Sequence, residues 1–173
     1  LVSVSRAAAP ADRAVAILAN RDDPESLELA RHYAKRRGLP ETAILALPMP
    51  LTEQITWEQF VVTIWNPLVR EAVARGWMLA SVRDETDPVG RLRITSAGHR
   101  LEALVVCRGV PLRIDHDATR YDPATNPLTA NSSLRTNRAA VDSELALLAS
   151  AGRSRPMRAS MRPCSTLAGM PAP

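Results

Sequence analysis

The sequence predicts an α/β fold in which an open, mainly parallel sheet is flanked by helices. Short apolar runs of strand length, rich in β-branched residues, occur at 14–20, 42–47 and 101–107. A segment with helical spacing and clear end signals lies between the first two runs. A strand, a helix and a second strand in this order make a right-handed crossover, which places the two strands parallel.

The helix between the first two strands is predicted at 24–37. Asp23 is typical of an N-cap, and Pro24 suits the first helical position, where a missing N–H costs nothing. Gly38 is typical of the residue that follows a helix, and Pro40 prevents continuation. Both ends of this helix are therefore specified locally.

A second helix is predicted from Thr56 to about Arg75. Thr56 and Gln59 have the spacing of a capping box, in which each side chain bonds the other residue's backbone N–H. Asn66 and Pro67 interrupt the helical pattern. We expect either a kink there or a second segment capped by Asn66.

The remaining body is less regular. Residues 77–100 are expected to form a hairpin excursion, exposed at its tip around 84–90. The third strand is expected to continue beyond 107 to about 114. A polar loop is expected at 115–138, and a helix at 137–150.

Three regions follow from this pattern. Residues 1–12 are expected to be a leader or the remnant of a signal peptide, because small residues there fit a cleavage site. Residues 13–150 form the α/β domain. Residues 151–173 are an irregular basic tail, interpreted as out-of-frame or disordered, so the sheet is expected to be truncated. A sheet cut after three strands leaves an unpaired edge and an exposed apolar face.

The charge distribution argues against a nucleic-acid partner. All 18 acidic residues lie at or before Glu144, and four of the 22 basic residues lie after Ser150. The body is therefore electrically balanced, and the net charge of +4 belongs to the tail. No apolar run is long enough to span a membrane. The partner is expected to be an unknown small molecule or peptide.

The carboxyl ends of the predicted strands are the expected place for a cleft, since ligands bind there in open parallel sheets. The polar residues that follow the strands or the last loop are the cleft candidates: Asn20, Asp22, Arg108, Asp142 and Glu144. The alternative is that Asn20 and Asp22 only shape a turn and that Asp142 only caps a helix. No cofactor is expected, because the segment after the first strand has none of the glycines of a nucleotide-binding loop.

Other reactive residues give weaker signals. Asp115, His116 and Asp117 are the densest group of metal-type ligands, but a solvated acidic loop is the favoured interpretation, and no metal is predicted. Cys107 lies in an apolar strand, where a buried thiol is a poor nucleophile. His99 is expected to complete a turn.

Several strings taken together resemble an uncharacterised family of bacterial proteins, often with export signals, in which RGVPLR and VDSELALL segments recur. The resemblance implies export to the periplasm or beyond the cell; otherwise the chain is expected in the cytoplasm. A fainter likeness to the caspase-like, gingipain-type peptidase fold implies a flavodoxin-like or caspase-like start to the sheet. The strings that carry the family resemblance are 20–26, 37–40, 98–100, 107–113 and 140–146.

The functional expectation is an α/β domain with a ligand-binding or catalytic cleft at the carboxyl ends of its strands. A peptidase-like hydrolase is the enzymatic interpretation that the fold likeness implies. The alternative is a non-catalytic binding or interaction module. The sequence leaves open whether the chain is an enzyme.

Overall fold

The computed structural model describes residues 14–120 and 136–150 of the 173-residue chain. The predicted leader (1–12) and the predicted basic tail (151–173) lie outside these residues.

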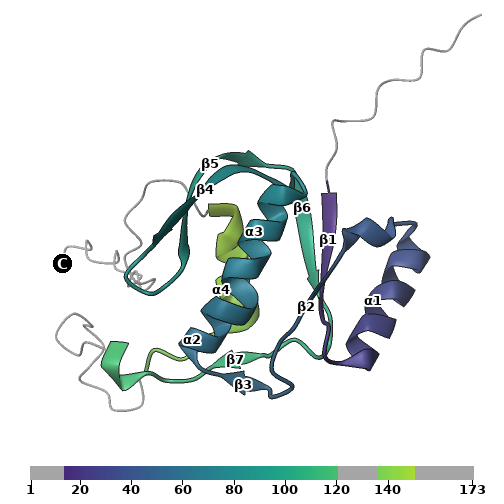
Figure 1. The fold of residues 1–173 in the computed structure, drawn as a ribbon. Coiled ribbons are helices and arrows are strands. Elements are labelled where there is room, and N and C mark those ends of the chain that lie inside the picture. Colours follow the sequence, from purple (N-terminus) through teal and green to yellow (C-terminus); the bar gives the residue numbers. More distant parts are fainter. Residues whose placement is uncertain (1–13, 121–135, 151–173) are drawn as a thin grey trace, which may run out of the picture.

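A three-stranded parallel sheet forms the centre of the fold, with strand order β2-β1-β6. These strands are β1 (Ala14–Asn20), β2 (Ile44–Leu47) and β6 (Leu101–Val106). Helix α1 (Pro24–Arg37) covers one face, and the other helices cover the opposite face (Figure 1). The α/β class with a parallel sheet is thereby confirmed.

Strand β1 is central because it is apolar on both faces. Ala16 and Leu18 belong to the larger core on one side, whereas Ile17 and Ala19 pack with Ala30 of α1 on the other. All four strand residues are fully buried. A strand sealed on both faces is typical of parallel sheets and explains the continuous apolar run in the sequence.

Helix α1 has the predicted bounds and both predicted caps. The Asp23 side chain accepts a hydrogen bond from the N–H of Glu25 at 3.0 Å. Gly38 ends the helix with a left-handed φ of 64°, a conformation that glycine adopts without a Cβ penalty.

The second strand begins later than predicted. Residues Glu41–Ala43 form one 3₁₀ turn, and β2 pairs with β1 only from Ile44 onward. The turn follows Pro40, whose carbonyl accepts a bond from the N–H of Ala43. The apolar run at 42–47 therefore contains both the end of a turn and a strand.

The third strand does not continue to 114. The N–H of Cys107 still donates to Leu18, but Val110 then bonds back to Cys107 and closes a turn. The chain is extended again only in β7 (Arg113–Ile114), which belongs to a different sheet. The turn carries the chain off the end of the central sheet.

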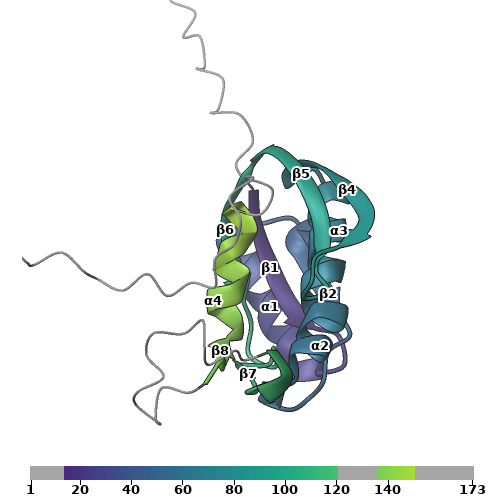
Figure 2. The ribbon, with the colours of Figure 1, turned by 90° about the vertical axis from the view of Figure 1, so that its left-hand side faces the viewer.

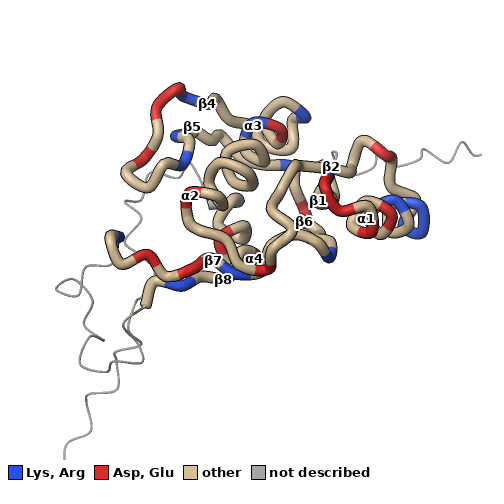
Figure 3. The backbone as a smooth tube through the Cα atoms, turned by 60° about the horizontal axis from the view of Figure 1, so that its bottom comes forward, with Lys and Arg blue, Asp and Glu red and all other residues tan. Residues whose placement is uncertain are grey.

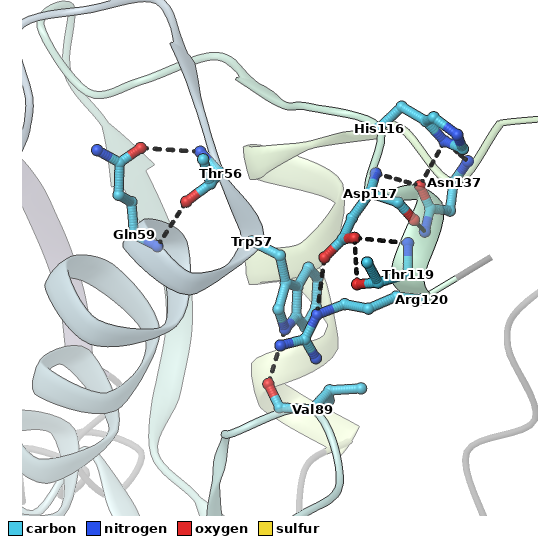
Figure 4. Close-up of polar contacts among 9 residues, drawn as sticks. All are labelled: Thr56, Trp57, Gln59, Val89, His116, Asp117, Thr119, Arg120 and Asn137. Carbon is cyan, nitrogen blue, oxygen red and sulfur yellow. Dashed lines mark hydrogen bonds and ion pairs between the residues drawn. The ribbon is translucent and has the colours of Figure 1, made fainter.

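The second helical region is one continuous segment of three parts: α2 (Trp57–Gln59), the π-helical segment η2 (Phe60–Trp65) and α3 (Asn66–Ala74). The predicted capping box is confirmed. The Thr56 hydroxyl accepts from the N–H of Gln59 at 3.1 Å, and the Gln59 side chain accepts from the N–H of Thr56 at 2.9 Å (Figure 4).

Pro67 accounts for the π-helical segment. A proline inside a helix lacks an N–H and its ring crowds the carbonyl four residues earlier, here that of Thr63. The N–H of Asn66 bonds to the carbonyl of Val61, five residues back, so the helix widens just before the proline. The sequence interruption at Asn66 and Pro67 therefore produces a widened turn and no break.

The predicted hairpin excursion is present. Strands β4 (Met78–Thr86) and β5 (Leu92–His99) pair antiparallel, with irregularities in the register. The turn between them closes through Asp87, whose N–H donates to the carbonyl of Arg91 at 2.8 Å. The hairpin arches over the helical side of the molecule (Figure 2).

The expected exposure of the tip holds for residues 84–86 and Pro88, whereas the turn that follows is docked on the helices. The indole N–H of Trp57 donates to the carbonyl of Val89 at 2.7 Å. The Asn66 amide donates to the carbonyl of Gly90 at 3.2 Å and accepts from the N–H of Leu92 at 2.9 Å. These side chains replace the water that would otherwise solvate the turn.

Arg91 fastens the same turn to two further elements. It is 9% exposed, and its guanidinium lies 5.5 Å from the ring centres of both Trp57 and Trp65. It also pairs with Asp87 at 3.1 Å and with Glu144 at 3.7 Å. A planar cation of this kind contacts aromatic faces and carboxylates at once.

A second, small sheet lies beyond the carboxyl ends of the central strands. It contains β3 (Gln54–Ile55), β7 and β8 (Ala139–Ala140), in the order β3-β7-β8. Strand β7 runs parallel to β3 and antiparallel to β8.

The last helix starts later than predicted. The predicted range 137–150 contains β8, then α4 (Val141–Ala146), then a 3₁₀ turn over Leu147–Ser150. Pairing with β7 holds the first residues extended, and the N–H of Val141 donates to the carbonyl of Leu112. A long-range pairing thus overrides the helical pattern of the local sequence.

Among the described residues, β6 pairs with β1 alone, so the expected unpaired edge is present at one side of the central sheet. Helix α4 packs on the face of the sheet next to this edge (Figure 2).

Replacing Asn66 is predicted to loosen the docked hairpin turn. Asn66→Ala leaves the Gly90 carbonyl and the Leu92 N–H without their partners, and should lower the unfolding free energy by about 1–3 kcal/mol. Val62→Ala, at an exposed position of the same helical region, is the matched control and should lose less. Urea denaturation and amide hydrogen exchange at Leu92 measure this order; equal losses in the two variants would contradict it.

Candidate functional site

Asn20 lies at the carboxyl end of β1 and is fully buried. Its amide nitrogen donates to the carbonyl oxygens of Met49, at 3.2 Å, and Gly109, at 2.9 Å. Its amide oxygen accepts from the N–H groups of Asp22, at 3.0 Å, and Met49, at 3.2 Å. One side chain therefore joins the segments that follow all three central strands.

This arrangement uses the whole hydrogen-bonding capacity of the Asn20 amide, which has two N–H donors and two acceptor lone pairs. The backbone N–H of Asn20 is also taken, by the Ser26 hydroxyl at 3.0 Å. Asn20 is therefore a structural joint at the predicted cleft and has no group left for a ligand.

Gly109 makes the close approach at this joint possible. Its φ is +92°, and a Cβ at this position would overlap the Asp23 carboxylate and come within 2.9 Å of the Ser26 Cβ. The turn after β6 thus lies directly on the first residues of α1. Because Asp23 already caps that helix, its N-terminus is occupied by the protein itself.

Asp22 and Arg108 lie on the surface around this joint. Asp22 is exposed, and its backbone N–H bonds to Asn20. Arg108 pairs with Glu25 at 2.8 Å, with side chains 78% and 69% exposed. An exposed ion pair of this kind contributes little to stability. The structure therefore places Asn20, Asp22 and Arg108 near the same strand ends but forms no enclosed cleft from their side chains.

Asp142 and Glu144 point in different directions from α4, as their helical spacing predicts. Asp142 is exposed, and its carboxylate accepts from the N–H of Ser143 at 2.8 Å instead of capping the helix. Glu144 is turned toward Arg91. Burial raises the pKa of the Glu144 carboxyl, and the Arg91 charge opposes that rise.

Hydrogen bonds within the fold hold the segment 115–117. The N–H of Asp115 donates to the carbonyl of Ile55, and Figure 4 shows the contacts of His116 and Asp117 with Asn137 and Thr119. The Asp117 carboxylate accepts from both the N–H and the hydroxyl of Thr119, and it pairs with Arg120 at 3.0 Å. Hydrogen bonds from Thr119 are the main cause that lowers the Asp117 pKa. Within 14–120 and 136–150, no group of three or more His, Cys, Asp or Glu could hold a metal ion.

Asn137 is a structural residue that sequence reasoning missed. Its amide oxygen accepts from the N–H of Asp117 and its amide nitrogen donates to the carbonyl of Asp117, each at 2.9 Å. His116 contacts the same amide oxygen through Nδ1 at 2.8 Å. Asn137 and Asp117 are 20 positions apart, so no local sequence pattern could have predicted their pairing.

Of the two remaining reactive side chains, Cys107 is a poor nucleophile as expected, whereas His99 belongs to strand β5, where it pairs with Met78, and not to a turn. Cys107 is buried, and burial raises the pKa of its thiol, which keeps it protonated and unreactive. His99 is exposed at the end of β5, and its Nδ1 lies 2.9 Å from the carbonyl oxygen of Leu101.

A groove of about 350 Å³ lies between the free edge of β6 and α4. This groove, called the β6 groove below, is a site that the list of cleft candidates anticipated only through Asp142. The side chains that line it come from β6, α4 and the base of the hairpin: Met78, His99, Leu101, Glu102, Ala103, Leu104, Val106, Asp142, Leu145, Ala146 and Leu148.

Backbone groups of β6 also face this groove. The N–H of Cys107, just beyond the strand, donates to the carbonyl of Leu18 in β1. Because successive residues of a strand direct their N–H and C=O groups to opposite sides, those of Leu104 and Val106 face the free edge. Val106 is also 38% exposed, although it is apolar.

Comparison with protein-family models, with curated proteins and with solved structures finds no match to this chain. Within the part of the chain that the structure describes, no helix is both long and apolar enough to cross a membrane. The geometry of the chain itself is therefore what bears on its function.

Replacing Asn20 by aspartate is predicted to destabilise the fold. Asn20→Asp removes both N–H donors and places a carboxylate against the carbonyls of Met49 and Gly109, so the unfolding free energy should fall by about 3 kcal/mol or more at neutral pH. Asp22→Asn is the matched control, with an expected change within about 0.5 kcal/mol. Urea denaturation measures both; equal stability of Asn20→Asp and the wild type would refute the structural role.

Glu144→Gln is predicted to change how stability depends on pH. The folded state holds the Glu144 proton more tightly than the unfolded state, because burial raises this pKa above its ordinary 4.5. The stabilisation that the protonated Glu144 gives the folded state is therefore fully present below pH 4.5, and it is lost as the pH rises through the raised pKa of the folded state. The wild type should lose stability relative to the variant over that rise. Parallel curves from urea denaturation across pH would contradict the prediction.

Proposed function

We propose that this domain is a non-catalytic interaction module that binds an extended polypeptide segment of another molecule along the β6 groove. One observation carries the proposal: within residues 14–120 and 136–150, no strand pairs with the outer edge of β6, which lies beside an apolar groove. The mode is strand addition, in which a peptide becomes the next strand of an existing sheet.

The edge itself selects an extended backbone. The groups of Leu104 and Val106 on the free side alternate donor and acceptor at strand spacing, which another strand complements. An edge that is not meant to pair is commonly blocked by lysine, proline or a bulge. The carboxyl-terminal half of β6, at Leu104, Val105 and Val106, contains no lysine, proline or bulge.

The groove selects apolar side chains. Leu101, Leu104 and Val106 form one wall, and Leu145 and Leu148 form the other. A bound strand directs every second side chain toward α4, so apolar residues at alternate positions would fill the space. Burying each such side chain favours binding by about 1.5–3 kcal/mol before the entropy of association is subtracted.

Binding is favoured over hydrolysis by the state of the candidate reactive groups. The Asn20 amide is fully used in holding the strand ends together. The Cys107 thiol is buried with a raised pKa, whereas a nucleophilic cysteine needs a lowered one. The peptidase-like proposal therefore has the fold likeness as its support, and a fold does not determine an activity.

The test uses the full chain and a displayed library of short peptides in which apolar and polar positions alternate. Alternating peptides should enrich over scrambled peptides of the same composition. Val106→Pro removes one edge N–H without touching the pairing with β1, and should weaken the enriched peptides about tenfold. Val106→Thr keeps that N–H and should weaken them less.

Fluorescence anisotropy with a labelled, enriched peptide measures these affinities, and circular dichroism checks that each variant is folded. The proposal is overturned if alternating and scrambled peptides enrich equally, or if Val106→Pro binds as well as the wild type.

A further inference from the structure

The charged residues that line the β6 groove are negative. Figure 3 shows basic and acidic residues interspersed along α1 and the β4–β5 hairpin. The β6 groove differs, because the two charged residues that line it, Glu102 and Asp142, are both acidic and the other lining residues are mostly apolar. An acidic side chain at the margin of an apolar groove favours a ligand that supplies a cation there.

Asp142 is the carboxylate that is placed to pair with a cation of the ligand. Elsewhere in the fold, acids pair with arginines, as Glu25 does with Arg108 and Asp117 with Arg120. Among the described residues Asp142 has no such cation, and its carboxylate accepts only from the N–H of Ser143. Its neighbour on α4, Glu144, is turned away toward Arg91.

The position of Asp142 along the groove follows from the start of α4. The N–H of Val141 is bonded to the carbonyl of Leu112, beyond the carboxyl end of β6. Asp142 therefore lies toward the Val106 end of the groove, whereas Leu148 and Met78 line it together with Leu101 near the start of the strand. The groove therefore carries the Asp142 carboxylate beside Val106, and the α4 side continues from there with the apolar residues Leu145, Ala146 and Leu148.

We propose that the segment bound in the β6 groove is an apolar strand that carries an arginine or lysine opposite Asp142, beside Val106. This inference rests on the proposed strand addition and adds the chemistry of the partner. The stem of a long basic side chain packs on the apolar wall while its charged end reaches the carboxylate. Pairing at the margin of an apolar groove is less screened by water than pairing on an open surface.

A second copy of this chain fits the groove less well. Its own β6 (Leu101–Val106) has no arginine or lysine that could pair with Asp142. A basic segment of a different polypeptide is therefore the occupant to which we commit, and self-association is an outcome that the experiment can detect.

The experiment compares two versions of one enriched alternating peptide, with arginine or with glutamate at the position beside Val106. The full-length wild type should prefer the arginine peptide about fivefold at low salt, and less at high salt. Asp142→Asn should abolish the preference and Asp142→Lys should reverse it. Ser143→Lys is the matched control: it alters the net charge as much as Asp142→Asn, at an exposed neighbour outside the groove lining, and should retain the preference.

The outcomes separate this inference from the proposed function. Peptide binding that Val106→Pro weakens but that shows no charge preference would overturn the basic partner and leave strand addition intact. Absence of edge binding would overturn both. Analytical ultracentrifugation of the wild type and Val106→Pro completes the test, since a dimer lost in the proline variant would assign the groove to a second copy.

Discussion

The buried amide of Asn20 is the interaction on which the arrangement of the fold depends. It holds the segments after β1, β2 and β6 in one hydrogen-bonded unit at the carboxyl ends of the strands. Gly109 allows that unit to close against α1, because a side chain there would collide with Asp23. The position where open α/β sheets commonly bind ligands is therefore filled by the chain's own polar network. The β6 groove lies elsewhere, at the side of the sheet.

Features with local causes could be predicted from the sequence, and features with distant causes could not. The caps of α1 and the capping box at Thr56 depend on neighbouring residues, and both are where the pattern places them. The late start of α4 depends on pairing with β7, and the docked hairpin turn depends on Trp57 and Arg91 meeting across the fold. The pattern of a single sequence carries no information about such long-range contacts.

The candidate site shows the same division. Polar residues after strands were correctly expected at the strand ends, but whether Asn20 serves a ligand or the backbone depends on carbonyl groups far along the chain. The unpaired edge was predictable from the number of strands. Its groove was not, because α4 had first to be placed beside β6. Asp142, which was expected at the strand ends, therefore lies at the margin of the β6 groove.

The hydrogen bonds of Asn20 also constrain the order of folding. Its partners Met49 and Gly109 are 29 and 89 positions away, so β1 leaves the ribosome well before β6 exists to cover its second side. Contacts of such long sequence separation close slowly, and an apolar strand that waits for them is open to association with other chains. Of the three strands of the central sheet, the most buried one, β1, is thus synthesised first, and its pairing is complete only after β6 has been made.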